Sequence, residues 1–368
     1  MENKIVSLAI HRETKANIMR DLLENNGIKV FLKEIQSDTL SFSVGIFEKD
    51  IAKALEIIED NRLFNYSNKE IAKIDDGRKR ILVPVDFSND SLKACRFAFS
   101  VAKSIGAKVK ILHVFDRVYP VQIPFIGMTQ EDKEKNEDLL TKSRKKILDL
   151  CNSIDKEISE GILPSINFSY ALREGDARGE IDVFIDEYQP SLVVMGTRGV
   201  GAGSKSSDYI GSSVTADIIE TTNVPIIAIP YSSYINDVKD IKHLVFLVNN
   251  LSQELTFDNL VHLLNLNNPF KVTVVHLNIA GESIIWGESE IQSQRDIIQR
   301  QYPGRNIESK LVETTGVIEG IDDLLKDIKA DMIALNTKER NIWGLIFKPS
   351  TSRKIISQIN TSIMILRN

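Results

Sequence analysis

A glycine-rich segment near the middle of the chain carries the residue types best suited to bind an anion. An apolar run at residues 192–195 leads into residues 196–213, which read GTRGVGAGSKSSDYIGSS. Glycine lets a backbone come close to a ligand, and the free N–H groups at the start of a helix favour negative charge. The pattern predicts a phosphate-binding loop that runs into a helix beginning near Ser213.

Two other interpretations of this segment have to be weighed. A Walker A loop needs glycine directly before its Lys-Ser pair, and this chain has Ser204 there, before Lys205. The segment also follows the fourth predicted strand of its domain instead of the first, which argues against a P-loop NTPase, although Lys205 can still reach a phosphate. A flexible connector is the other alternative, because glycine-rich loops also join elements.

Composition narrows the class of protein. The chain has 368 residues, 42% of them hydrophobic and 26% charged, with a net charge of -5. This balance excludes a disordered chain and a basic nucleic-acid surface. No apolar run approaches the roughly 18 to 20 residues that span a bilayer, and with the polar start Met-Glu-Asn-Lys this predicts a cytoplasmic protein with no membrane partner. Cys95 and Cys151 lie in helical patterns, so we expect buried thiols and no disulfide or cysteine-bound metal.

Residues 1–65 predict a small α+β domain of order βαββα. Strands are expected at residues 5–10, 29–35 and 40–47, with one helix ending at Asn26, where Gly27 stops it, and another over residues 51–58. Residues 66–79 are polar and aperiodic, which is typical of a linker between domains.

Strands and helices alternate from residue 80 to residue 232. Strands are expected at residues 81–85, 108–114, 167–172, 192–195 and 224–229, with helices at about residues 90–105, from Glu131, at 179–188 and from Ser213. This order predicts a parallel sheet with helices on both faces and ligands at the carboxyl ends of the strands.

The last third of the chain, residues 233–368, repeats this order. Residues 81–86 align with residues 244–249, and residues 108–113 with residues 271–276, both at a shift of 163. Later elements match at shorter shifts, as expected if the second copy has shorter loops. The sequence therefore predicts a duplicated α/β domain.

Four motifs together resemble the universal stress protein family. They are Val-Pro-Val-Asp-Phe-Ser at residues 83–88, His113-Val114 after the second strand, Gly-Asp-Ala-Arg-Gly-Glu-Ile at residues 175–181, and the glycine loop ending in Gly211-Ser212. The resemblance implies an α/β fold with two flavodoxin- or Rossmann-like parallel five-stranded sheets, of the kind shared with adenine nucleotide alpha hydrolases, plus the α+β N-terminal domain.

The resemblance also implies an adenine nucleotide site in residues 80–232, for ATP, ADP or AMP, with or without Mg²⁺. Asp86 would accept hydrogen bonds from the ribose hydroxyls or the adenine amine, and Val114 would offer backbone groups to the base. Six further residues would surround the phosphates: Gly196, Arg198, Gly199, Gly211, Ser212 and Ser213. A simpler role for Asp86 is to cap the helix that follows it.

This chain departs from the family pattern at two places. The family has nine residues between the second glycine of the loop and the last, whereas eleven separate Gly199 from Gly211 here, which makes adenosine binding a safer expectation than triphosphate binding. In the second copy Asn249, Asn336, Glu339 and Pro349 replace Asp86, Gly196, Gly199 and Gly211. A carboxylate at Glu339 would repel phosphate, so we expect no nucleotide there and a surface for a protein partner instead.

The sequence thus favours a stress-response sensor or regulator that binds an adenine nucleotide. The sequence shows no nucleophile paired with a base, no pair of carboxylates and no metal cluster, so we do not predict a dedicated enzyme. Any ATP hydrolysis would be slow and incidental. His113 recurs as His276 in the degenerate copy, which favours a structural role for both. The alternative function is a scaffold without nucleotide, in which the apolar strands at residues 224–229 and 362–366 pair the copies as an internal pseudo-dimer, or pair two chains as a homodimer.

Overall fold

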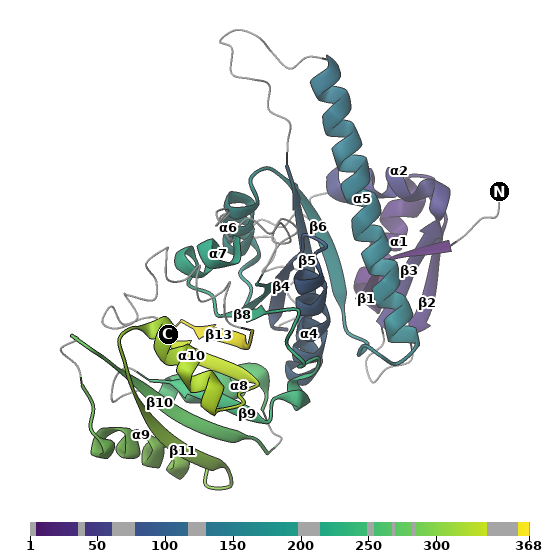
Figure 1. Cartoon of the computed structure of the whole chain (residues 1–368). Helices are drawn as coiled ribbons and strands as arrows, with labels where there is room; N and C mark the ends of the chain where they lie inside the picture. Colours follow the sequence, from purple (N-terminus) through teal and green to yellow (C-terminus); the bar gives the residue numbers. More distant parts are fainter. Residues whose placement is uncertain are drawn as a thin grey trace. The chain divides into compact units, whose positions relative to one another are not determined.

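The computed structural model describes residues 5–35, 41–60, 78–116, 130–197, 214–248, 254–266, 269–281, 285–336 and 360–367 (Figure 1). The chain divides into two compact units. The first comprises residues 1–86 and 106–190, and the second residues 87–105 and 191–368. None of the helices in the described ranges is long and apolar enough to cross a membrane.

The N-terminal part of the first unit has the predicted βαββα order. Its elements are β1 (Ile5–Arg12), α1 (Glu13–Asn25), β2 (Val30–Ile35), β3 (Ser41–Phe47), the short 3-10 turn η1 (Glu48–Asp50) and α2 (Ile51–Asp60). β3 pairs antiparallel with both β1 and β2. Gly27 has a φ of 78°, so the glycine ends α1 in a left-handed conformation, as the sequence predicts.

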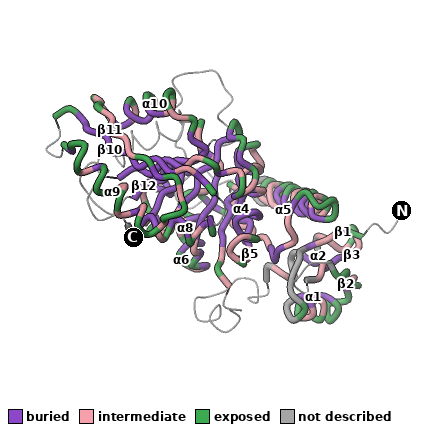
Figure 2. Tube along the Cα trace, turned by 90° about the horizontal axis from the view of Figure 1, so that it is seen from below, coloured by how far each residue is buried: buried purple, intermediate pink, exposed green. Residues whose placement is uncertain are grey.

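The rest of the first unit is an α/β layer. It contains β4 (Arg80–Pro84), β5 (Lys108–Phe115), α5 (Gln130–Ser159), β6 (Phe168–Glu174) and α6 (Ala177–Tyr188). β5 lies between β4 and β6 and is parallel to both. β1 continues the sheet beyond β6 through an antiparallel contact of Ile10 with Phe168, which gives the order β4–β5–β6–β1–β3–β2. The long helix α5 alternates between buried and exposed residues (Figure 2).

The second unit begins with α4 (Asn89–Ile105), β7 (Leu192–Gly196), α7 (Val214–Thr221), β8 (Ile226–Ile229) and the turn η2 (Val238–Asp240). The C-terminal third then adds β9 (His243–Leu247), α8 (Glu254–Leu264), β10 (Lys271–Ile279), α9 (Glu288–Gln301), β11 (Asn306–Thr314), α10 (Val317–Asp327), β12 (Met332–Asn336) and β13 (Ser362–Leu366). β9 to β13 form a parallel sheet in the order β11–β10–β9–β12–β13, which is a doubly wound arrangement. The predicted α/β class, with parallel sheets and a small α+β N-terminal part, is confirmed.

β8 and β13, the last strands of residues 80–232 and 233–368, pair with each other inside the second unit. β8 and β13 run antiparallel, with Met364 opposite Ile227 and Ile365 opposite Ile226. Every residue of both strands is buried. Nearby, the hydroxyl groups of Ser233 and Ser362 are hydrogen-bonded at 3.0 Å. This pairing joins β7 and β8 of the first copy to the five strands of the second in one sheet.

Candidate functional site

The chain turns sharply where β4 ends. Val85 extends the strand by donating its N–H to the carbonyl oxygen of Leu112 at 2.8 Å, and Asp86 follows, half-buried. Phe87 then has a φ of 64°, which is uncommon for a residue other than glycine, asparagine or aspartate. Such a conformation persists only where the surrounding structure holds it, so the direction of the chain after Asp86 is firmly set.

The helix that follows this turn is capped by serine. The hydroxyl of Ser88 accepts the N–H of Ser91 at 3.3 Å, and the carbonyl of Ser88 accepts the N–H of Leu92 at 2.9 Å. This is the geometry of an N-cap residue. Because Ser88 caps α4, this helix does not depend on Asp86 for an N-cap. The alternative role of Asp86 as the capping residue therefore loses its main support.

His113 ties the end of β5 to the end of β4. Its Nδ1 lies 2.8 Å from the carbonyl oxygen of Val85, and because a carbonyl only accepts, Nδ1 carries the proton. Burial is the main influence on His113 and lowers its pKa, and the charge of Lys146 lowers the pKa further. The hydrogen bond to Val85 and the charge of Asp86 raise the pKa but do not outweigh burial. A neutral, buried imidazole agrees with the predicted structural role, and the carboxylate of Asp86 and the ammonium of Lys146 both lie near enough to act on it.

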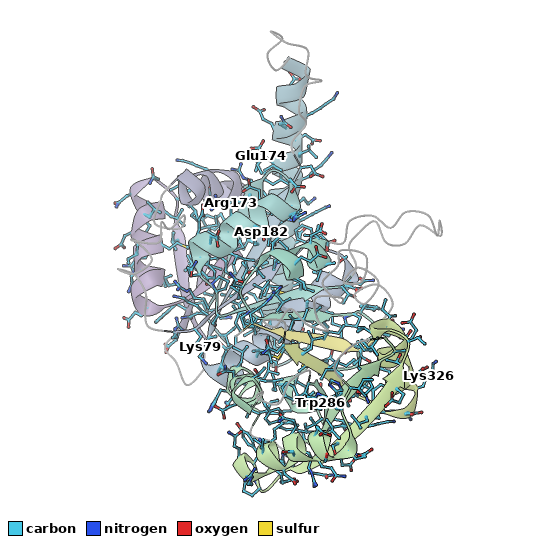
Figure 3. The ribbon with its side chains drawn as sticks, turned by 90° about the vertical axis from the view of Figure 1, so that its left-hand side faces the viewer. Lys79, Arg173, Glu174, Asp182, Trp286 and Lys326 are labelled. Carbon is cyan, nitrogen blue, oxygen red and sulfur yellow. The ribbon has the colours of Figure 1, made fainter. Side chains whose placement is uncertain are left out.

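Val114 lies in the part of β5 that extends beyond the end of β4. The β4–β5 register ends with Pro84 opposite Leu112, whereas the β5–β6 register continues through Val114 opposite Arg173 and Phe115 opposite Glu174. Arg173 and Glu174 are labelled in Figure 3. On the side that faces β4, Val114 is therefore not paired in the β4–β5 register. Asp86 follows β4, and Val114 lies near the carboxyl end of the parallel neighbour β5, so the first unit brings these two predicted residues to one edge of its sheet.

Gly196 ends β7 in the second unit, and the packing around it requires glycine. A Cβ at this position would lie 2.6 Å from the backbone carbon of Asp90 and 2.6 Å from the backbone nitrogen of Ser91, both in the first turn of α4. Real Cβ atoms do not approach backbone so closely. What approaches Gly196 in the described residues is therefore a helix of the protein itself. The predicted approach of its backbone to a phosphate stays a prediction.

Two threonines that sequence reasoning missed hold this junction. Thr197 donates its hydroxyl to a carboxylate oxygen of Asp90 at 2.8 Å, and both residues are buried. Thr215, in the first turn of α7, donates to the carbonyl oxygen of Gly196 at 2.6 Å. Their closeness in sequence to the glycine loop was a signal that could have indicated them, but which partner each selects depends on the packing of α4 and α7 against β7.

The remaining predicted phosphate residues fall outside the described ranges. They are Arg198, Gly199, Gly211, Ser212 and Ser213, together with Lys205. α7 begins at Val214, one residue after the predicted start. The phosphate contacts of these residues stay predictions, as does the effect of the two additional loop residues.

The second copy repeats the strand-end geometry of the first. Nδ1 of His276 lies 2.9 Å from the carbonyl oxygen of Val248, and the N–H of Val248 donates to Val275 at 2.8 Å. These are the bonds of His113, Val85 and Leu112 displaced by 163 residues. What differs is an indole: Trp286, labelled in Figure 3, stacks on the imidazole of His276 with ring centroids 4.1 Å apart.

The position that matches Gly196 in the second copy is also filled. Asn336 donates its side-chain amide to the hydroxyl of Thr256 on α8 at 2.9 Å. Both residues are buried, so this hydrogen bond pairs two polar side chains away from water. The other substituted positions, Asn249, Glu339 and Pro349, lie outside the described ranges.

The described residues offer no metal-binding cluster. Within them, no group of three or more His, Cys, Asp or Glu side chains is placed to hold a metal ion. Cys95 and Cys151 are both fully buried, as the sequence predicts.

Comparison with known proteins identifies relatives for the middle of the chain. A family model described as the universal stress protein family matches residues 77–230. A universal stress protein of Methanocaldococcus jannaschii is 26% identical over 160 residues, which cover 41% of this chain and 81% of that one. A universal stress protein A homolog of Haemophilus influenzae is 30% identical over 110 residues, which cover 29% of this chain and 74% of that one.

A likeness in fold reaches further along the chain. The crystal structure of a universal stress protein from Archaeoglobus fulgidus superposes with a TM-score of 0.53 at 16% sequence identity. The superposition covers 79% of this chain and 96% of that one, which is more of this chain than the family model matches. At this level of identity the similarity concerns the fold alone.

Proposed function

Because the chain belongs to the universal stress protein family, we propose that it is a stress-response protein that binds an adenine nucleotide with residues 80–232 and acts as a sensor or regulator. The observation that carries the proposal is the shared edge of Asp86 and Val114. Asp86 follows β4 in a turn that the positive φ of Phe87 defines. Ser88 caps α4, so the carboxylate of Asp86 is not needed for that role. Val114 of β5 lies beyond the last residue that pairs with β4. A carboxylate beside backbone hydrogen-bonding groups matches what a ribose and an adenine ring need.

Each predicted residue has one job in this proposal. Asp86 accepts hydrogen bonds from the ribose hydroxyls, and the backbone of Val114 bonds the edge of the base. Gly196, whose carbonyl is anchored by Thr215, starts the loop toward the phosphates. The loop residues then surround the phosphates with N–H groups, hydroxyls and one guanidinium: Arg198, Gly199, Gly211, Ser212 and Ser213.

Calorimetric titration of the full chain tests the proposal. ATP, ADP and AMP are titrated with and without Mg²⁺, and binding heat is expected for at least one of them. Asp86→Ala should abolish that heat, whereas Asp186→Ala, which removes an exposed carboxylate from α6, should leave it unchanged. Heat that survives in Asp86→Ala would remove that residue from the site, and no heat with any nucleotide would end the sensor proposal.

A scaffold without nucleotide is the second candidate, and the β8–β13 ladder is the observation that favours it. The ladder joins apolar strands of the two copies, and in the second copy Trp286 and Asn336 occupy positions near the equivalent strand ends. A scaffold predicts no heat in the titration and a chain whose partners do not change with nucleotide. Any ATP hydrolysis is incidental under both candidates.

A further inference from the structure

Helix α5 connects the α/β layer of the first unit to its N-terminal βαββα module, residues 5–35 and 41–60. α5 packs against β1 of the module and against β5 and β6 of the layer. Its Leu148 belongs to the same buried cluster as Leu8 of β1 and Ala16 of α1. The seam between module and helix is therefore an apolar, packed interface.

One carboxylate lies inside this seam. Asp155 is two turns further along α5 than Leu148, and both of its carboxylate oxygens are buried. An ionised carboxylate without hydrogen bonds is costly to bury, because protein interior replaces the water that would solvate it. The module thus covers a group that favours water as long as it carries its charge.

The module places polar groups close to this carboxylate but does not neutralise it. The hydroxyl of Ser7 on β1 lies close enough to Asp155 to lower the pKa of the carboxyl by hydrogen bonding, and it is also hydrogen-bonded to the hydroxyl of Ser43 on β3 at 2.6 Å. Lys33 on β2 acts on the carboxylate through its charge, with an exposed side chain. Burial outweighs both influences and raises the pKa of Asp155 to about 6.

Three charged groups on the other elements around α5 have partners of their own. Lys53 of α2 donates to the carbonyl of Asn26, the ammonium of Lys110 on β5 lies 5.9 Å from the centre of the Tyr188 ring, and Arg173 on β6 is paired with Glu187. On α5 itself, the residues one turn before and one turn after Asp155 are uncharged: Cys151, Asn152, Ile158 and Ser159. Lys33 is thus the charge that moderates the titration of Asp155.

We propose that Asp155 makes the seating of the N-terminal module on helix α5 dependent on pH, so that the module is held most tightly in mildly acidic conditions. When the module is released, the carboxyl group returns to water and to its ordinary acidity. The seated state then binds a proton that the released state gives up. The free energy by which protonation of Asp155 favours the seated state is complete below the pKa that the carboxyl has when the module is released. It declines as the pH rises through the pKa that the carboxyl has when the module is seated. A fall in pH therefore closes the module onto the α/β layer.

Hydrogen–deuterium exchange of the full chain tests the proposal. Protection of the amides in β1 and α1 is followed from pH 5 to pH 7.5 and corrected for intrinsic exchange. With a seated pKa near 6 and an ordinary one near 4, linkage predicts about a tenfold loss of protection over this range. Asp155→Asn should give a flat profile, because an amide does not titrate. Asp149→Asn, the same change at an exposed position of α5, should keep the profile of the unmodified chain.

A variant of Lys33 keeps the test decisive even if Asp155→Asn does not fold. Lys33 is exposed, and its charge lowers the pKa of Asp155, so Lys33→Gln should move the loss of protection to higher pH. A flat profile in the unmodified chain would overturn the proposal. So would a slope that persists in Asp155→Asn, or a midpoint that Lys33→Gln leaves in place or moves to lower pH.

Discussion

The imidazole of His276 and the indole of Trp286 lie face to face, with ring centroids 4.1 Å apart and planes 6° from parallel. Asn278 holds the tryptophan backbone in place, since its side-chain amide donates to the carbonyl of Trp286 and its side-chain oxygen accepts the N–H of Trp286, both at 2.9 Å. The stack lies on β10, the strand that matches β5 of the first copy. An aromatic side chain of the protein itself therefore covers the imidazole of His276 on β10.

Removal of the indole should destabilise the C-terminal part of the chain. Trp286 is 6% exposed, so Trp286→Ala leaves a large cavity against His276 and should lower the free energy of unfolding by about 3 kcal/mol or more. Urea unfolding measures this. Ile285→Ala is the matched control: Ile285 is 68% exposed, and its loss should change the free energy by less than about 0.5 kcal/mol. Equal losses in the two variants would contradict the packing role.

The packing around Gly196 predicts a stability effect that does not require any nucleotide. Gly196→Ala would push a Cβ into the backbone of Asp90 and Ser91, and relief of that overlap should cost about 1–3 kcal/mol. Thermal and urea unfolding without nucleotide measure the loss. Gly304→Ala adds the same methyl group where no atom lies within 4 Å and should be nearly neutral. A Gly196→Ala protein of unchanged stability would show that α4 can move aside.

The hydroxyl of Thr197 should contribute more to the free energy of unfolding than its methyl group does. Thr197→Val keeps the shape but takes away the hydrogen bond that a buried oxygen of Asp90 accepts, and it should cost about 1–3 kcal/mol. Thr197→Ser retains the hydroxyl and should recover most of the loss. Urea unfolding of the three proteins measures the difference. A serine variant as unstable as the valine variant would show that the methyl group contributes as much to stability as the hydroxyl.

Two buried histidines and the half-buried His243 predict how overall stability changes with pH. Burial lowers the pKa of His113, His243 and His276 in the folded chain. As the pH falls through about 6.5, the unfolded chain takes up protons on these rings before the folded chain does, so the free energy of unfolding should fall. The sign is opposite to that expected for the seating of the N-terminal module.

Urea midpoints at pH 7.5 and pH 5.5 measure this dependence. His276→Gln should reduce the difference between the two midpoints, because an amide can donate to Val248 and does not titrate. His262→Gln is the control, since His262 is an exposed residue of α8. An unchanged difference in His276→Gln would exclude that ring as a source of the pH dependence.

Much of the local structure could be predicted from the sequence. Gly27, in its left-handed conformation, ends α1 near the predicted residue, and the shift of 163 places the ends of β4 and β9 on matching residues. These features depend on backbone preferences and on the period of apolar residues, both of which are local. The structural role predicted for His113 also agrees with its bond to Val85, and it was the repeated histidine that indicated it.

The tertiary structure decided which groups meet. The sequence by itself determined the order of strands and helices, the duplicated pattern, and the placement of Asp86 and Val114 at strand ends. Only packing determined that Gly196 lies against the backbone of α4, that Ser88 rather than Asp86 caps this helix, and that the module of residues 5–60 buries Asp155. The physical reason is that periodicity fixes which face of an element is apolar, whereas the partner of a buried polar group depends on elements far away in sequence.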